Sequence, residues 1–195
     1  METDVKAILL SLHSLQFYAA LTSVLAVILT ARKNILCWPI GILGTFLSAY
    51  VYFAQQLPFE ALLQVVYVGM AVYGWVNWSK ASPNKHLKVE TATRKEHLVL
   101  IVSAILLGLG LGTISYSYYL TYSSYVDSFL TTFSIGANWL AAKRKIENWW
   151  YWIAIDLVSV VFYEWRGMHW FALLFGFFVI IAIRGLSSWK EEVKA

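Results

Sequence analysis

Residues 145–165 read KIENWWYWIAIDLVSVVFYEW, a stretch whose apolar and aromatic interior holds a single acidic residue, Asp156. About 20 mainly apolar residues form a helix long enough to cross a lipid bilayer. A carboxylate at the centre of a bilayer costs at least ~2.5 kcal/mol, so it needs either a partner or a function. The stretch therefore predicts a transmembrane helix with a buried acid near mid-depth.

The composition of the whole chain points the same way. Of its 195 residues, 59% are hydrophobic, 17% are aromatic and 13% are charged, and the mean hydropathy is +0.62. A soluble domain of this length could not bury so much apolar surface, which predicts an integral membrane protein. The net charge of +4 comes from basic residues in short connections, so it does not indicate a nucleic-acid partner.

Seven stretches are apolar enough to be membrane spans, and no polar segment is long enough for a second domain. We expect one transmembrane domain over residues 1–195, all-α, with spans at 5–31, 35–54, 59–78, 98–118, 124–142, 148–165 and 168–189. The longest polar segment, 79–97, carries five basic residues, and we expect it to be a solvated loop.

Basic residues occur in every second connection, at 32–33, in 79–97 and at 143–145. Cytoplasmic loops of membrane proteins carry the excess of lysine and arginine, so this alternation predicts an outside N-terminus and a cytoplasmic C-terminus. The N-terminal METDVK carries acids in place of a basic segment, so we expect no cleaved signal peptide.

The chain also matches itself when it is shifted by 111 positions without a gap. The matched pairs include Ala31 with Ala142, Trp38 with Trp149, Gly74 with Gly185 and Trp78 with Trp189. This register predicts repeat one at about 5–78, a linker helix at about 98–118 and repeat two at about 124–189. One helix between the repeats makes them parallel, a 3+1+3 plan that places a transporter's substrate between the repeats near the midplane, here between spans 2–3 and spans 5–6.

Helical spacing gathers polar and aromatic residues on one face of several spans. In lipid such groups face the interior of the bundle or a water-filled path. The candidate substrate-binding residues on these faces are Asp156, Trp152, Trp149 and Ser159 in 148–165, Asn138 in 124–142, Trp38 and Thr45 in 35–54, and Gln64 in 59–78.

Asp156 has no basic residue at its own depth in the sequence, so we favour a role facing a cationic substrate. Tryptophan faces attract cations by roughly 0.5–2 kcal/mol, which suits an organic cation with a flat ring. The alternative is a structural acid bonded to Asn138 or Ser159. Gln64 and Asn138 could equally bond neighbouring helices, and an interfacial belt accounts for three further tryptophans, Trp78, Trp150 and Trp189.

Three stretches carry a family resemblance: CWPIGILG at 37–44, LLQVVYVGMAVYGWVNW at 62–78 and KRKIENWWYWIAIDLVSV at 143–160. They resemble the PnuC family of vitamin transporters over nearly the whole chain. The resemblance implies a passive facilitator in the bacterial inner membrane for nicotinamide riboside or thiamine, with a separate cytoplasmic kinase that traps the substrate. It also implies that Gln64, Trp152 and Asp156 lie at pocket positions.

Two positions depart from the nicotinamide riboside pattern of that family. Asp156 stands where that branch usually has Asn, and Ala71 where it often has Asn. Together with WPIG these resemble the thiamine branch, so thiamine is slightly favoured and nicotinamide riboside is the alternative.

Other classes of function fit the residues less well. A sugar uniporter could share the helix plan but would need no central acid. No nucleophile–base set, metal spacing or phosphate loop is present, so we expect no enzyme, no catalytic residue, no metal and no cofactor. No filter-like or signalling element indicates a channel or receptor. A proton on Asp156 could couple transport, although we expect facilitated diffusion, and broad aromatic surfaces leave a homo-oligomer open.

Overall fold

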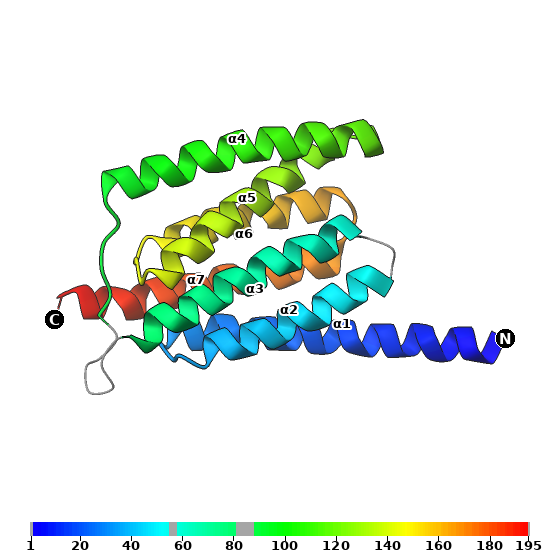
Figure 1. The fold of residues 1–195 in the computed structure, drawn as a ribbon, viewed down its shortest axis with the longest axis horizontal. Helices are drawn as coiled ribbons and strands as arrows, with labels where there is room; N and C mark the ends of the chain where they lie inside the picture. Colours follow the sequence, from blue (N-terminus) through cyan, green and yellow to red (C-terminus); the bar gives the residue numbers. More distant parts are fainter. Residues whose placement is uncertain (1, 55–57, 81–87, 195) are drawn as a thin grey trace. The chain divides into compact units, whose positions relative to one another are not determined.

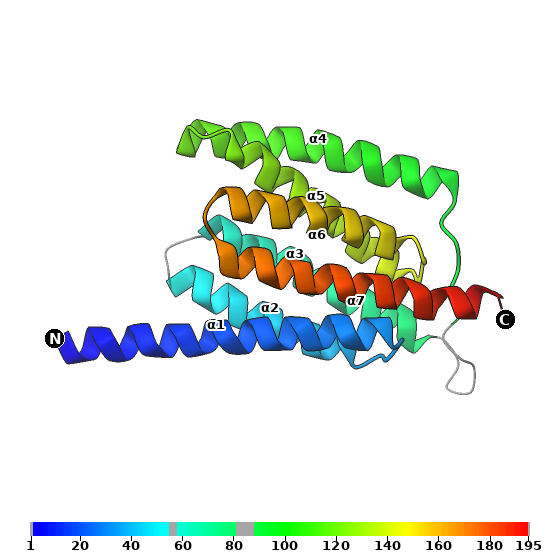
Figure 2. The same ribbon diagram turned by 180° about the vertical axis from the view of Figure 1, so that it is seen from behind.

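The computed structural model describes the backbone of residues 2–54, 58–80 and 88–194, and the side chains of 14–51, 53–54, 63–80, 88–118 and 120–193. Within these ranges every regular element is a helix, as predicted (Figures 1 and 2). The helices fall into two compact units, residues 1–83 and 84–195, and each unit is described by itself.

The first unit holds three helices, α1 (Glu2–Ala31), α2 (Cys37–Ala54) and α3 (Pro58–Ser79). The second holds four, α4 (Arg94–Tyr119), α5 (Ser123–Ala142), α6 (Asn148–Trp165) and α7 (His169–Lys194). Every predicted span corresponds to one of these helices, with ends that differ by at most five residues. Within each unit, helices that follow one another in the sequence pack together.

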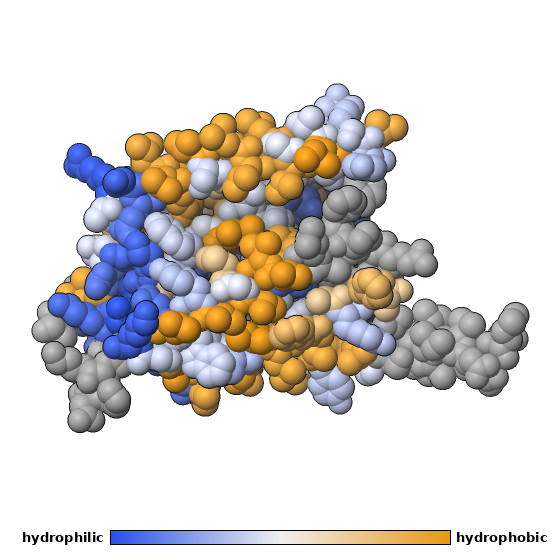
Figure 3. Space-filling model, in the orientation of Figure 1, coloured by the Kyte–Doolittle hydropathy of each residue, from blue (hydrophilic) through white to orange (hydrophobic). Residues whose placement is uncertain are grey.

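The surface of the helices is that of a membrane protein. Three helical stretches, Ser14–Ala31, Arg94–Tyr118 and His169–Val193, are long and apolar enough to cross a bilayer, and Cys37–Val51 is a shorter apolar one. Large apolar side chains along α4 are exposed, among them Leu98, Leu106 and Leu107. Figure 3 shows apolar residues along α4 and hydrophilic residues gathered where that helix begins. Exposed apolar surface of this extent is what lipid, and not water, would cover.

Helix α4 begins and ends at clear local signals. Thr93 is its N-cap and exchanges hydrogen bonds with Glu96 in a capping box, which satisfies amides that the first turn leaves free. At the other end Leu120 takes a left-handed conformation with φ 51° and its amide bonds the carbonyl of Tyr116. Thr132 of α5 then donates to the carbonyl of Ala104 at 2.9 Å, which ties α5 to α4 in a buried position.

Helix ends in the two units follow the predicted register. Helix α6 begins and ends 111 positions after α2, at Asn148 and Trp165 against Cys37 and Ala54. Helix α7 likewise begins 111 positions after α3, at His169 against Pro58. The turns before α2 and α6 also agree bond by bond. Equivalent amides donate at 2.9 Å to equivalent carbonyls: Lys33 to Thr30, Asn34 to Leu29, Arg144 to Ala141 and Lys145 to Leu140.

A buried tryptophan pair recurs in each unit. Trp38 and Trp78 meet edge to face with ring centroids 5.3 Å apart, and Trp149 meets Trp189 in the same way at 5.6 Å. A glycine makes room for the first ring of each pair. A Cβ added to Gly74 would lie 2.4 Å from the Trp38 ring, and one added to Gly185 would lie 2.6 Å from the Trp149 ring.

The tryptophan pairs overturn one expectation. Trp78 and Trp189 were predicted for an interfacial belt, yet their side chains are among those the fold buries completely. The expectation was wrong because each indole fills the space between two helices of its own unit, where it packs on the partner tryptophan. Trp150, the third predicted belt residue, is exposed, with the Lys190 ammonium 5.3 Å from its ring centroid.

Candidate substrate site

Helix α6 carries the predicted polar face, and the fold buries its centre. Asp156 is 3% exposed and Ser159 is 2% exposed, one turn apart on the same side of the helix. Helix α6 packs against α7 and α5, so both side chains lie inside the second unit. The apolar stretch and the helical spacing therefore located the buried acid correctly.

Asp156 has no ion pair and no hydrogen bond among the residues that the structure describes. The two partners considered for a structural acid, Asn138 and Ser159, do not bond it. Arg184 of α7, a basic residue within a candidate span, does not pair with it either and is exposed. A buried carboxylate without a partner is unfavourable when charged, so a proton, a cation or water that reaches it would lower the cost.

Trp152 lies one helical turn before Asp156 and is half-buried. No other aromatic ring stacks on it within the described part of the chain. A half-buried indole one turn from the acid is the kind of ring that a site for a flat cation requires. On α5, Asn138 is half-buried and makes no hydrogen bond to a described residue, so its amide is also free to bind a ligand.

Trp149 and Trp38 have a different environment from Trp152. Both are buried in the helix packing of their own units, where each rests on a glycine and a second tryptophan. The indole nitrogen of each has no acceptor among the described residues. The packing explains why these tryptophans are present, and their predicted contact with substrate stays a prediction.

The remaining candidates belong to the first unit. Thr45 of α2 donates its hydroxyl to the carbonyl of Gly41 at 2.8 Å, so its proton is used within its own helix. Gln64 of α3 is half-buried and has no bond to a described residue. The structure thus collects Asp156, Ser159, Trp152 and Asn138 in one unit, and it leaves Gln64 and Thr45 in the other.

Sequence reasoning missed the structure at the N-terminal end of α6. Asn148 is completely buried, and its side-chain amide donates to the carbonyl of Lys145 at 2.7 Å. Residues 88–93 belong to the segment predicted as a solvated loop, and four of them, at 88, 90, 91 and 93, are exposed as predicted. The sequence did not predict that Val89 is buried or that backbone groups of Glu90 and Ala92 bond the α5–α6 turn. The signal available was one of charge, with acids at 90 and 96 and bases at 143–145.

No group of three or more His, Cys, Asp or Glu side chains that could hold a metal occurs among the described residues. The candidate residues of the second unit that are not used in helix packing are one carboxylate, an indole, an amide and a hydroxyl. Such groups bind and orient a cationic, aromatic solute by charge, stacking and hydrogen bonds.

Comparison with known proteins identifies the family. Residues 13–191 match the family described as nicotinamide mononucleotide transporter. The chain is 24% identical to the nicotinamide riboside transporter PnuC of Escherichia coli K12 over 200 residues, which span 89% of this chain and 84% of the relative. It is 26% identical to the nicotinamide riboside transporter PnuC of Neisseria mucosa over 199 residues, 90% of this chain and 72% of the relative.

A third relative and a crystal structure are also named as vitamin transporters. The riboflavin/roseoflavin transporter RibM of Streptomyces davaonensis is 25% identical over 166 residues, 81% of this chain and 76% of the relative. A crystal structure of the vitamin B3 transporter PnuC shares the fold with a TM-score of 0.72 and 21% identity, covering 98% of this chain and 88% of that one. These proteins transport vitamins, which leaves the sugar uniporter alternative without support. The chain therefore belongs to the PnuC family and is a multi-pass membrane transporter of the vitamin type, not an enzyme.

Proposed function

We propose that this transporter carries a flat, cationic vitamin or vitamin precursor across the membrane by facilitated diffusion, with Asp156 as the residue that binds the cation. The observation that carries the proposal is the buried Asp156 carboxylate, 3% exposed, for which the described residues supply neither a cation nor a hydrogen-bond donor. A cationic substrate would supply the missing charge.

The same environment accounts for selectivity. A neutral solute would leave the carboxylate unpaired in a dry site, whereas a cation offsets the cost of its burial. Trp152, one turn away, adds a ring face that attracts the cation by roughly 0.5–2 kcal/mol. Ser159 and Asn138 offer hydrogen bonds to the polar groups of a substrate. The affinity comes from a few contacts, which lets a facilitator release its substrate.

Nicotinamide riboside is the first candidate, because two of the relatives above are named for it. Its pyridinium ring is flat and permanently cationic, as the site requires. Thiamine also carries a cationic ring, and the reasons to favour it are Asp156 and Ala71, a buried position on α3. No relative named above is a thiamine transporter, so the sequence-based preference for thiamine has no further support, and thiamine stays the alternative.

We also infer the direction and energetics of uptake. The alternation of basic connections favours an outside N-terminus and a cytoplasmic C-terminus in a bacterial inner membrane. No described basic side chain pairs with Asp156. The substrate itself is therefore the proposed charge partner, and transport needs no driving ion. A facilitator of this kind only equilibrates its substrate, and net uptake then requires a cytoplasmic kinase that phosphorylates the vitamin.

The test is uptake into vesicles that contain the purified protein and no kinase. Labelled nicotinamide riboside, thiamine and riboflavin are compared without a proton or sodium gradient. We expect the cationic substrate to equilibrate, and we expect Asp156→Asn to weaken its binding by about tenfold or more, since hydrogen bonds to charged groups contribute about 1.5–3 kcal/mol.

The matched control is Glu164→Gln, which removes a carboxylate from an exposed position near the other end of α6 and should leave uptake unchanged. Full binding of the cationic substrate by Asp156→Asn would refute the assignment of Asp156. Accumulation above equilibrium under an imposed proton gradient would refute facilitated diffusion. Preference for riboflavin over both cations would refute the proposed substrate class.

A further inference from the structure

The segment just before α4 lies along the turn that joins α5 to α6. The amide of Glu90 donates to the carbonyl of Arg144 at 3.0 Å, and the amide of Ile146 donates to the carbonyl of Glu90 at 2.9 Å. These two bonds form a parallel bridge between Glu90 and Lys145. Val89, the residue before Glu90, is buried. A connection between helices is thus held by its backbone and by an apolar anchor.

Side chains of the turn reinforce this contact. Lys145 is only 8% exposed, and its ammonium lies 2.9 Å from a carboxylate oxygen of Glu90 and donates to the carbonyl of Thr91 at 3.1 Å. A buried lysine is costly unless its protons are accepted, and here the segment supplies the acceptors. Glu147 completes the set, because its carboxylate accepts the amide of Ala92 at 2.7 Å.

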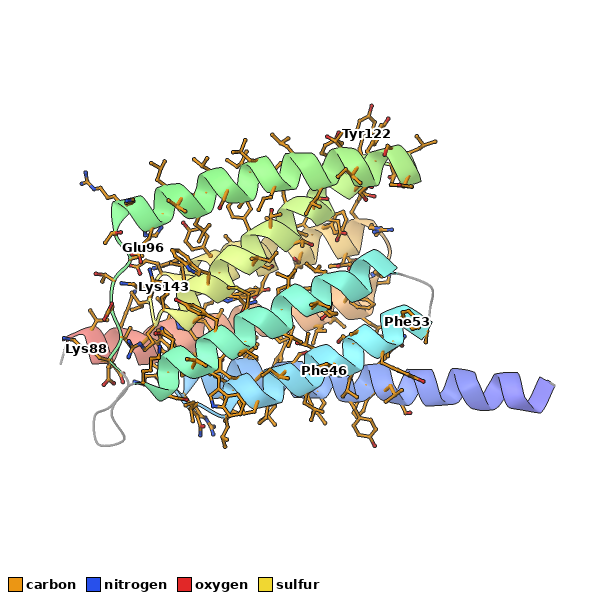
Figure 4. The ribbon with its side chains drawn as sticks, in the orientation of Figure 1. Phe46, Phe53, Lys88, Glu96, Tyr122 and Lys143 are labelled. Atoms are coloured by element: carbon orange, nitrogen blue, oxygen red, sulfur yellow. The ribbon has the colours of Figure 1, made fainter. Side chains whose placement is uncertain are left out.

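The first turn of α4 continues the attachment. Glu96 forms an ion pair with Lys143 at the end of α5, at 2.5 Å, and Figure 4 shows these two side chains reaching toward each other. The Nδ1 atom of His97 lies 2.8 Å from the hydroxyl oxygen of Tyr151, in the first turn of α6, and the two rings stack. The start of α4 is therefore bonded to the end of α5 and to the beginning of α6.

We propose that residues 89–93 form a strap that fixes the N-terminal end of α6, and that Lys145 and Glu147 are positioning residues for the helix that carries Asp156. Glu147 directly precedes α6, and Asn148, its first residue, is bonded back to Lys145. Asp156 follows eight residues later, about 12 Å along a helix. A rigid helix transmits a shift or rotation of its first turn to that carboxylate.

The test of the strap is amide hydrogen exchange on the purified protein without substrate, comparing Glu147→Ala with Glu147→Gln. The alanine variant loses the acceptor for the Ala92 amide, whereas the glutamine variant keeps an oxygen there. We expect exchange at Ala92 and Ile146 to accelerate about tenfold in Glu147→Ala, as for loss of a hydrogen bond to a charged group, and much less in Glu147→Gln. Glu164→Gln, at the far end of α6, is the matched control.

The functional part rests on the proposed role of Asp156 and is measured separately, as the affinity for labelled nicotinamide riboside. We expect Glu147→Ala to weaken binding several-fold and Glu147→Gln to retain it. If Glu147→Ala does not fold, Glu90→Gln, which alters a half-exposed partner of Lys145, takes its place, with faster exchange at Ile146 expected.

Unchanged exchange at Ala92 and Ile146 in Glu147→Ala would refute the strap whatever the substrate is. Faster exchange with unchanged affinity would refute the positioning role and leave the strap. Failure of Asp156→Asn to alter binding, with exchange as expected, would refute the proposed function alone. The three results are therefore distinguishable.

Discussion

The turn between α1 and α2 and the turn between α5 and α6 have the same backbone and different attachments. Lys33 and Arg144, at equivalent positions, both take a left-handed conformation, with φ 57° and 61°. Residues other than glycine adopt it at a cost of about 1–2 kcal/mol, so both turns are held by their surroundings. Where the second turn has Lys145 and Glu147, the first has Asn34 and Leu36, neither of which carries a charge.

The amides of the two turns show the consequence. The amide of Ile146 donates to the strap, whereas the amide of the equivalent residue, Ile35, donates no hydrogen bond to a described residue. What the repeats share is the turn and the tryptophan packed on glycine, and what they do not share is the strap and the buried acid. The shared parts determine how three helices pack, and the unshared parts lie on the unit that we propose binds the cation. This difference predicts which substitutions act alike in both units.

The largest effects should come from the shared tryptophans. Trp149→Ala and Trp38→Ala each leave a large cavity between two helices, and we expect each to lower the free energy of unfolding by about 3–5 kcal/mol. Thermal unfolding in detergent measures this, and Trp152→Ala is the control, since that ring is half-buried. A large loss for one tryptophan and none for the other would break the equivalence of the repeats.

The shared glycines should give the next effect in size. A Cβ at Gly185 or Gly74 would overlap the tryptophan ring, so we expect Gly185→Ala and Gly74→Ala each to destabilise the protein by about 1–3 kcal/mol. Gly69→Ala is a matched control, because nothing lies within 4 Å of its added Cβ. The double variant Gly185→Ala/Trp149→Phe should cost less than the sum of its parts, because a smaller ring relieves the overlap. Additive costs would show that the ring and the glycine are not coupled.

The sequence predicted the helices well because every span must be apolar over a length that crosses the lipid bilayer. Apolar length located α6 at both ends, and the spacing of residues such as Asp156 and Ser159 identified the buried face. Periodicity does not report on partners, so it could not show that Trp78 and Trp189 pack inside their units. The strap was missed because Glu90 and Lys145 are 55 residues apart and a run of basic residues is ordinarily solvated.

The smallest effect on stability should come from the contact between Glu90 of the strap and Lys145, which has no equivalent in the first unit. The Lys145 ammonium donates a hydrogen bond to the Glu90 carboxylate and holds its pKa below the ordinary 4.5. A lowered pKa means that Glu90 stabilises the strap fully above pH 4.5 and that this contribution is lost as the pH falls through its folded-state pKa. Because Glu90 is half-exposed, the contribution should be less than about 1 kcal/mol.

Hydrogen exchange at Ile146, corrected for the intrinsic rate at each pH, measures that contribution. Protection at pH 7 should exceed protection well below pH 4.5 by no more than about fivefold. In Lys145→Met most of the pH dependence should disappear, because the hydrogen bond from that ammonium is the main cause of the lowered pKa of Glu90, ahead of the charges of Arg144 and Lys88. Ile35 should show no such dependence, since its turn has no strap. Equal pH dependence at Ile35 and Ile146 would mean that the two turns respond to a shared change in the protein, and that Glu90 and Lys145 do not distinguish them.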